Sequence, residues 1–211
     1  MGRIPPVEVD TGAHRGEARC VTLSSDTAFL DGLARFGSVV DAVPPDRWDA
    51  SSPCEGWTVL DVLGHLGSSI AYGVSILEDR VHEWPTADRP ADLVGGEPAD
   101  YWSGVATSAR AALVGVDLED TRQTPMGTRT VGQALAFPAI DCYVHAWDIG
   151  HAVGIDVEVP ADAIAYTHHY LDPMPPDRMR GPGGAFGPEL PPPDDATPTE
   201  ALMAWTGRAP R

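Results

Sequence analysis

Within a long apolar stretch the chain reads Asp141-Cys142-Tyr143-Val144-His145-Ala146-Trp147-Asp148. On an α-helix, residues four apart share a face and their Cβ atoms lie about 6 Å apart. Asp141 and His145 therefore form a pair whose gap suits a divalent metal ion. A hydrogen-bonded pair on an exposed face is the commoner use of this spacing, but an apolar helix makes unpaired polar groups costly. The setting favours the metal interpretation.

The same helix is predicted to begin at Thr130, which forms a capping box with Gln133. Pro138 lacks an amide proton and should bend the helix one turn before Asp141. Asp148 lies three residues beyond His145 on the metal face. It is expected either to fix the tautomer of a ligand imidazole, in a supporting catalytic role, or to hydrogen-bond a neighbouring helix.

Upstream, a second helical pattern reads Thr58-Val59-Leu60-Asp61-Val62-Leu63-Gly64-His65-Leu66. Thr58 and Asp61 form a capping box, and Val59, Leu63, Leu66 and Ile70 form an inward stripe. His65 lies roughly 100° around the helix from that stripe, at the edge of the core. A lone histidine there is more often structural, yet the position suits a third ligand between helices.

The candidate metal ligands are thus His65, Asp141 and His145. Two imidazoles and one carboxylate suit Zn(II) best, and ligand type alone leaves Ni(II), Fe(II) and Co(II) open. Cys54 and Cys142 have no evident basic neighbour in the sequence and are interpreted as inert thiols. Surface or packing roles are expected for the remaining histidines considered, which are His151, His168 and His169.

Other apolar stripes predict three further helices: one from Ser25 that stops at Pro44-Pro45, one over 102–113 and one over 160–171. A hairpin or turn is expected over 124–129, and no strand pattern of weight stands out. We therefore predict an all-α fold, with four main helices in a bundle whose interior can host ligands. Three parts are expected: a flexible arm over 1–22, the bundle over 23–172 and a proline-rich extended segment over 173–211, with a helical turn or two near 201–205.

Charge and composition exclude several classes of protein. With 31 acidic against 14 basic residues, the formal net charge is -17, which disfavours nucleic acid and anionic membrane surfaces. No apolar run approaching the roughly 20 residues of a membrane span and no leader peptide are evident, so a cytoplasmic protein is expected. The three cysteines are too scattered for a disulfide framework and are interpreted as reduced.

Three blocks carry a family resemblance: Pro53 through Leu66, Asp141 through Gly154, and Gly184-Ala185-Phe186-Gly187-Pro188-Glu189 running on to Gly207-Arg208-Ala209-Pro210. The chain resembles actinobacterial metal-binding proteins of the DinB-like superfamily, near the N-terminal domain of mycothiol-dependent maleylpyruvate isomerase. The resemblance implies a DinB-type four-helix bundle with a divalent ion, usually zinc, on His65, Asp141 and His145. The isomerase usually carries glutamate where Asp141 stands, and it has a further C-terminal domain.

By this resemblance the expected function is that of a metal-dependent S-transferase or isomerase acting on an electrophilic small molecule, with mycothiol as co-substrate. One alternative keeps the metal without the thiol, for hydrolysis, epimerisation or cyclisation. Another is a non-catalytic protein whose ion is structural or absent. Arg80, Arg178 and Arg180 are candidates for holding an anionic substrate, and a homodimer is a further expectation from related bundles.

Overall fold

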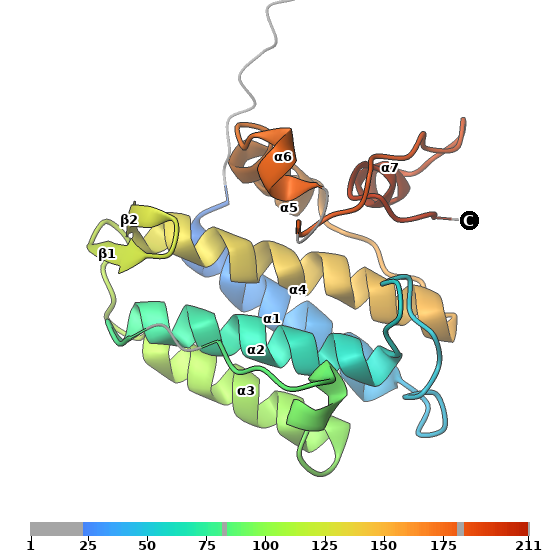
Figure 1. Ribbon diagram of the computed structural model, residues 1–211, viewed down its shortest axis with the longest axis horizontal. Helices are drawn as coiled ribbons and strands as arrows, with labels where there is room; N and C mark the ends of the chain where they lie inside the picture. Colours follow the sequence, from blue (N-terminus) through green and yellow to red (C-terminus); the bar gives the residue numbers. More distant parts are fainter. Residues whose placement is uncertain (1–22, 82–83, 181–183, 211) are drawn as a thin grey trace, which may run out of the picture.

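The computed structural model describes residues 23–81, 84–180 and 184–210, and the predicted arm over 1–22 lies outside this range. Four long helices lie side by side in Figure 1. They are α1 (Ser25–Ala42), α2 (Val59–Leu77), α3 (Pro98–Leu113) and α4 (Val131–Val153). Helices α1 and α2 each pack against both α3 and α4, which closes a four-helix bundle. The predicted helical fold is confirmed, and its four principal helices are the predicted ones.

The bundle is held by an apolar core to which all four helices contribute. Phe29, Leu63, Leu66 and Ile140 are among its fully or almost fully buried side chains. Burying such a side chain stabilises the fold by about 1.5–3 kcal/mol. The apolar inner faces and the polar outer faces of the helices thus follow the periodicity that is visible in the sequence.

Local chemistry sets the ends of the two helices that carry the candidate ligands. At α2, Thr58 Oγ1 accepts from the backbone N–H of Asp61, while the Asp61 carboxylate accepts from the Thr58 amide. At α4, Thr130 and Gln133 form the same reciprocal pair, and Gly154 closes the helix in the left-handed region with φ 80°. Both capping boxes satisfy amides that the first helical turn leaves unpaired.

Close approach of neighbouring segments depends on small residues along α2. A Cβ at Gly64 would lie 1.9 Å from the carbonyl oxygen of Pro90, in the 3-10 helix η1 (Pro90–Leu93). At Gly67 it would lie 2.0 Å from the hydroxyl of Tyr101. Glycine at these two positions therefore lets η1 and α3 pack directly against the α2 backbone.

One expectation needs correction, because the segment between α3 and α4 contains two short strands. Strands β1 (Thr121–Thr124) and β2 (Gly127–Thr130) pair antiparallel, with Thr121 opposite Thr130 and Thr124 opposite Gly127. Gly127 adopts φ 92°, a backbone conformation that residues other than glycine rarely adopt. The hairpin or turn expected over 124–129 is a hairpin, and the correction concerns its two strands, for which the sequence showed no clear pattern.

The C-terminal part of the chain packs beside α4 (Figure 1). The predicted helix over 160–171 is present as α5 (Ala161–Leu171). The segment over 173–211, expected to be extended apart from a turn or two near 201–205, contains α6 (Pro176–Met179) and α7 (Pro198–Trp205). Helix α5 contacts α4, and α7 contacts α5. Residues between α6 and α7 return toward the bundle, where they line the cavity described below.

By length and composition alone, helix α2 is apolar enough to cross a membrane. In the structure most of this helix is buried inside the protein, where it packs between α3 and α4. Packing in the core accounts for its apolar composition, which is therefore weak evidence for a membrane span.

Candidate metal centre

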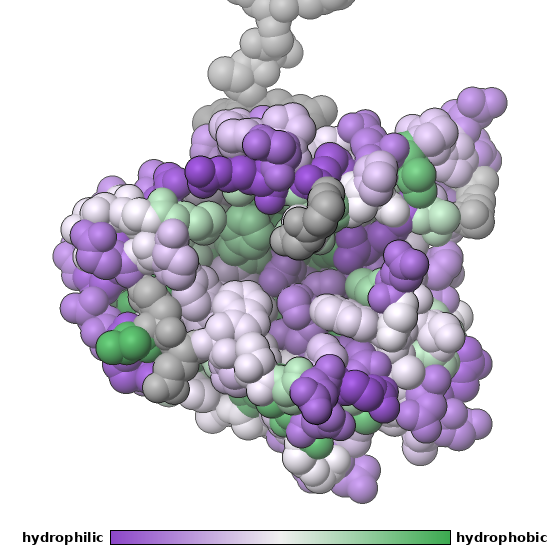
Figure 2. Space-filling view, in the orientation of Figure 1, coloured by the Kyte–Doolittle hydropathy of each residue, from purple (hydrophilic) through white to green (hydrophobic). Residues whose placement is uncertain are grey.

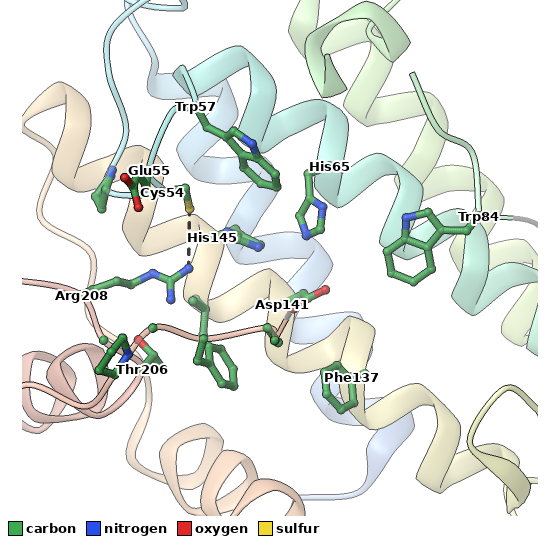
Figure 3. A pocket seen from close by; sticks show the side chains of 18 residues that line it. Cys54, Glu55, Trp57, His65, Trp84, Phe137, Asp141, His145, Thr206 and Arg208 are labelled. Carbon is green, nitrogen blue, oxygen red and sulfur yellow. Dashed lines mark hydrogen bonds between the residues drawn. The ribbon is translucent and has the colours of Figure 1, made fainter. Parts of the chain in front are cut away.

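A cavity of about 770 Å³ lies where α2, α4 and the C-terminal segment meet. Figure 2 shows the face of the molecule hollowed between the bundle and the C-terminal elements. The close view in Figure 3 shows His65 on α2, Asp141 and His145 on α4, and Arg208 on the C-terminal segment, around one space. All four residues line the cavity.

The structure brings together the three residues selected from the sequence. His65, Asp141 and His145 each offer one ligand atom, and these atoms lie within 4.8 Å of one another. The two imidazole rings meet edge to face with centroids 5.0 Å apart. His145 is only 6% exposed, whereas His65 and Asp141 are half-buried at the cavity wall.

Two hydrogen bonds hold the candidate ligands on α4 in place. The Ser69 hydroxyl on α2 donates to Asp141 Oδ2 at 2.6 Å. His145 Nδ1 lies 2.8 Å from Asp148 Oδ2, the contact expected of a carboxylate that fixes an imidazole tautomer. With Nδ1 occupied in this way, Nε2 is the nitrogen of His145 that remains for a ligand role.

Sequence reasoning missed Arg208, the residue that completes this network. Its Nε donates to Asp148 Oδ1 at 2.6 Å and a terminal nitrogen donates to Asp148 Oδ2 at 2.8 Å, a bidentate ion pair. Arg208 is 9% exposed and Asp148 is fully buried. The Gly207-Arg208 dipeptide was noted within a family-like block, but nothing in its spacing connects it with α4.

The interpretation of Cys54 as a thiol without a basic neighbour is wrong. Its Sγ lies 3.7 Å from a guanidinium nitrogen of Arg208, shown by the dashed line in Figure 3, and its S–H donates to Asp148 Oδ2 at 3.3 Å. Cys54, His145 and Asp148 also have potential ligand atoms within 4.8 Å of one another. In contrast, Cys142 is fully buried in the core, and burial raises the pKa of its thiol well above the usual value.

Electrostatics separate the two imidazoles. Burial, together with the charge of His145, lowers the pKa of His65 to about 4. Burial opposes ionisation of His145 as well, but its hydrogen bond to Asp148 outweighs that effect and raises its pKa. Burial would raise the pKa of Asp148, yet the adjacent guanidinium of Arg208 and the hydrogen bond with His145 hold it well below its usual range.

The three arginines considered for substrate binding lie outside the lining of this cavity. Arg80 pairs with Glu78 at 2.6 Å on the exposed surface. Arg180 donates to the carbonyl oxygens of Gly187 and Trp205, both at 2.6 Å, and so braces the C-terminal segment. These contacts favour a structural role for Arg180.

Three further histidines in the described part of the chain, His151, His168 and His169, lie outside the cavity lining, and each contacts a neighbour. His151 stacks on Trp147, with ring centroids 4.5 Å apart. His168 lies 3.0 Å from Asp172, and His169 meets Tyr170 edge to face. Packing and surface contacts account for these three residues.

The donor set fits a divalent metal ion. Two imidazoles and one carboxylate converge, one imidazole is already oriented by a buried carboxylate, and the set faces a cavity. Three protein ligands beside an open space are typical of a catalytic zinc site, whereas structural zinc sites are closed by four. Coordination would displace the second proton of His145, which makes metal uptake dependent on pH.

A family model described as the mycothiol maleylpyruvate isomerase N-terminal domain matches residues 29–150. The chain belongs to this family. Its matched region contains His65, Asp141, His145 and Asp148, while Arg208 lies beyond it. The resemblance drawn from the sequence motifs is thereby confirmed for the mycothiol maleylpyruvate isomerase family.

The chain is also similar to two relatives of known sequence, and it shares its fold with solved structures. Two uncharacterized proteins from strains of Mycobacterium tuberculosis are 26% identical over 185 residues, covering 83% of this chain and 93% of theirs. The crystal structure of the mycothiol-dependent maleylpyruvate isomerase superposes with a TM-score of 0.55 at 14% identity. A histidine-to-alanine mutant of that isomerase gives a TM-score of 0.52 at 12% identity. In both cases the match covers 67% of this chain but only 65% of the isomerase chain.

Proposed function

We propose that this protein is a metal-dependent enzyme that uses a small thiol, mycothiol, to act on an electrophilic small molecule as an S-transferase or isomerase. The observation that carries the proposal is the convergence of His65, Asp141 and His145 within 4.8 Å at a cavity of about 770 Å³. Family membership supports the thiol, because the solved relatives are described as mycothiol-dependent. Zinc is the proposed ion, and the cytoplasm is the proposed location.

A bound divalent ion would supply Lewis acidity that favours the thiolate form of a thiol at neutral pH. The residues of the chain have separate tasks around that centre. Asp148 orients His145 by accepting from Nδ1, and Ser69 orients Asp141 by donating to its carboxylate. Arg208 in turn fixes both oxygens of Asp148. Pre-oriented ligands of this kind retain metal more tightly, and loss of the supporting group costs about 10–100-fold in affinity.

Aromatic side chains form part of the cavity wall. Trp57 and Phe137 come from the bundle side, and Phe186 from the C-terminal segment, where it is 7% exposed. Excluding water strengthens electrostatic interactions and protects a reactive nucleophile. A cavity of this size accommodates a thiol together with a small acceptor, in keeping with typical ligand sites of about 300–1,000 Å³.

The first experiment asks whether the three residues hold a metal. Protein purified without added chelator is analysed by inductively coupled plasma mass spectrometry, beside the variants His145→Ala and His169→Ala. His169 is exposed and contacts Tyr170, so it serves as the matched control. We expect about one divalent ion per chain in the parent and in His169→Ala, and loss of the ion in His145→Ala.

The second experiment asks whether the metal-loaded protein uses the thiol. Isothermal titration with mycothiol should show saturable binding, and the S-methyl derivative of mycothiol should bind more weakly because it cannot ionise to a thiolate. Metal content without thiol binding would refute thiol dependence. A metal content equal in all three proteins would refute the ligand set itself.

A further inference from the structure

The charges and rings around the cavity carry information about the acceptor molecule. We propose that the electrophile is an uncharged aromatic or similarly planar apolar compound, and that organic anions are selected against. This inference rests on the proposed thiol function, because the thiolate enters the charge balance.

Aromatic rings surround the ligand imidazoles on the open side. Trp57 lies with its ring centroid 4.8 Å from that of His65, and Trp84 lies 6.4 Å from His65. Trp84 is 46% exposed and also contacts Tyr72, with centroids 5.2 Å apart. In Figure 3, Trp57 and Trp84 lie on either side of His65, and Phe137 lies on the α4 side beyond Asp141. Flat rings of this kind favour planar partners, which they contact by offset stacking or edge to face.

Charged side chains offer little to an anion. Among the described residues that line the cavity, the acidic and basic ones, histidines aside, are Glu55, Asp141 and Arg208. Arg208 would be the obvious clamp for a carboxylate, yet its guanidinium is committed to both oxygens of Asp148 and a further contact to Cys54. Its positive charge is therefore matched by an adjacent buried negative charge.

The remaining charges around the cavity either cancel one another or repel an organic anion. The charge of Asp141 and the charge of a thiolate together balance the two positive charges of a divalent ion. The pair of Arg208 and Asp148 contributes no net charge, which leaves the carboxylate of Glu55 at the rim. The formal charge of the whole chain, -17, adds long-range repulsion of anions at low salt. A neutral acceptor avoids all of these penalties.

Two probes that differ by one carboxylate test this inference through binding, without requiring turnover. They are 1,3-dinitrobenzene and 3,5-dinitrobenzoate, titrated calorimetrically into the zinc-loaded protein saturated with mycothiol. We expect the neutral probe to bind at least about tenfold more tightly, the factor that corresponds to 1.4 kcal/mol. Repeating the titrations without mycothiol removes the negative charge of the thiolate. The ratio of the two affinities should then be smaller.

Two variants connect the preference to named residues. Glu55→Gln removes the rim charge and should narrow the preference by about threefold, a modest factor because the carboxylate is exposed and screened. Glu119→Gln, an equally exposed acid outside the cavity lining, should leave the preference unchanged. Trp57→Leu should weaken binding of 1,3-dinitrobenzene by about fivefold through loss of ring contact.

Equal or tighter binding of 3,5-dinitrobenzoate overturns the inference, and so does failure of both probes to bind. The proposed function is judged separately, by metal content and mycothiol titration. If those two measurements succeed while the benzoate binds more tightly, the assignment of the acceptor fails and the thiol function stands. If mycothiol does not bind, both proposals fail, since the charge balance no longer holds.

Discussion

Replacing Asp148 by asparagine should affect both the stability of the fold and the metal affinity of the candidate site, which can be measured separately. The substitution keeps the shape of the side chain and removes its charge. Asp148 is fully buried, and it accepts from Arg208 at 2.6 and 2.8 Å and contacts His145 at 2.8 Å. Asp148→Asn therefore leaves the guanidinium of Arg208, only 9% exposed, without a counter-charge.

The expected cost follows from that burial. Removing one partner of a buried ion pair destabilises a protein by about 3–5 kcal/mol, because the other charge stays desolvated. Arg208→Met alone should cost a comparable amount by leaving Asp148 unpaired. The double variant removes both charges and should be more stable than the sum of the single effects predicts, by about 2 kcal/mol or more.

Equilibrium urea denaturation of the parent, both single variants and the double variant measures this coupling. Asp172→Asn is the matched control, because Asp172 pairs with His168 at 3.0 Å on the surface with a side-chain exposure of 58%. Exposed pairs contribute about 0–1 kcal/mol, so the control should scarcely change the free energy of unfolding. Metal affinity, measured by chelator competition, should fall about 10–100-fold in Asp148→Asn because His145 loses its orienting partner.

Two results would refute the reasoning. A loss below about 1 kcal/mol in Asp148→Asn would show that the guanidinium is hydrated or re-paired in the variant. Additivity of the two single substitutions to within about 0.5 kcal/mol would show that Asp148 and Arg208 stabilise the protein independently. Either result would contradict the role of Arg208 in holding His145 in place through Asp148.

Two other predictions concern α2. Burial raises the pKa of Asp61, but hydrogen bonds headed by that from the Thr58 side chain lower it to about 2, against an ordinary value of 3.8. Since this pKa is depressed in the folded state, about 2 kcal/mol of stability is present above pH 4 and is lost as the pH falls toward 2. Urea denaturation at a series of pH values should show that the free energy of unfolding falls less with acid in Asp61→Asn than in the parent. An equal fall in both proteins would contradict this assignment. Gly64→Ala places a Cβ 1.9 Å from the carbonyl oxygen of Pro90 and should cost about 2 kcal/mol or more. Gly104→Ala on α3 meets nothing within 4 Å and should stabilise by about 0.5–1 kcal/mol, so a similar change at both positions would contradict the packing argument.

The helices could be predicted because their signals are local. Apolar residues recur with the helical period. Each capping box joins two residues that are three apart in the sequence, Thr58 with Asp61 and Thr130 with Gln133. The same signals did not decide between a hairpin and a simple turn over 124–129, and they did not indicate the two strands. Strands β1 and β2 are polar and largely exposed, so they lack the alternation of apolar residues that indicates a half-buried strand. Their pairing depends on the turn at Gly127 more than on burial.

The residues of the candidate site likewise include some that local sequence signals predict and some that they do not. Asp141, His145 and Asp148 are related by helical spacing, and His65 lies at the edge of a stripe that the sequence displays. Cys54 and Arg208 reach Asp148 from positions 94 and 60 residues away along the chain. No periodicity connects residues so far apart when the path between them includes loops. Their contacts depend on how the C-terminal segment folds back onto the bundle.

The candidate ligands and the opposite wall of the cavity lie in different parts of the chain. The three candidate ligands lie on α2 and α4, inside the 29–150 region that matches the family model. Phe186 and Arg208, which form the opposite wall of the cavity, lie outside that region. The candidate ligands and the residues proposed to select the acceptor, Glu55, Trp57 and Trp84, therefore all lie in the bundle region. The C-terminal segment contributes the buried ion pair of Arg208 with Asp148, which holds His145 in place.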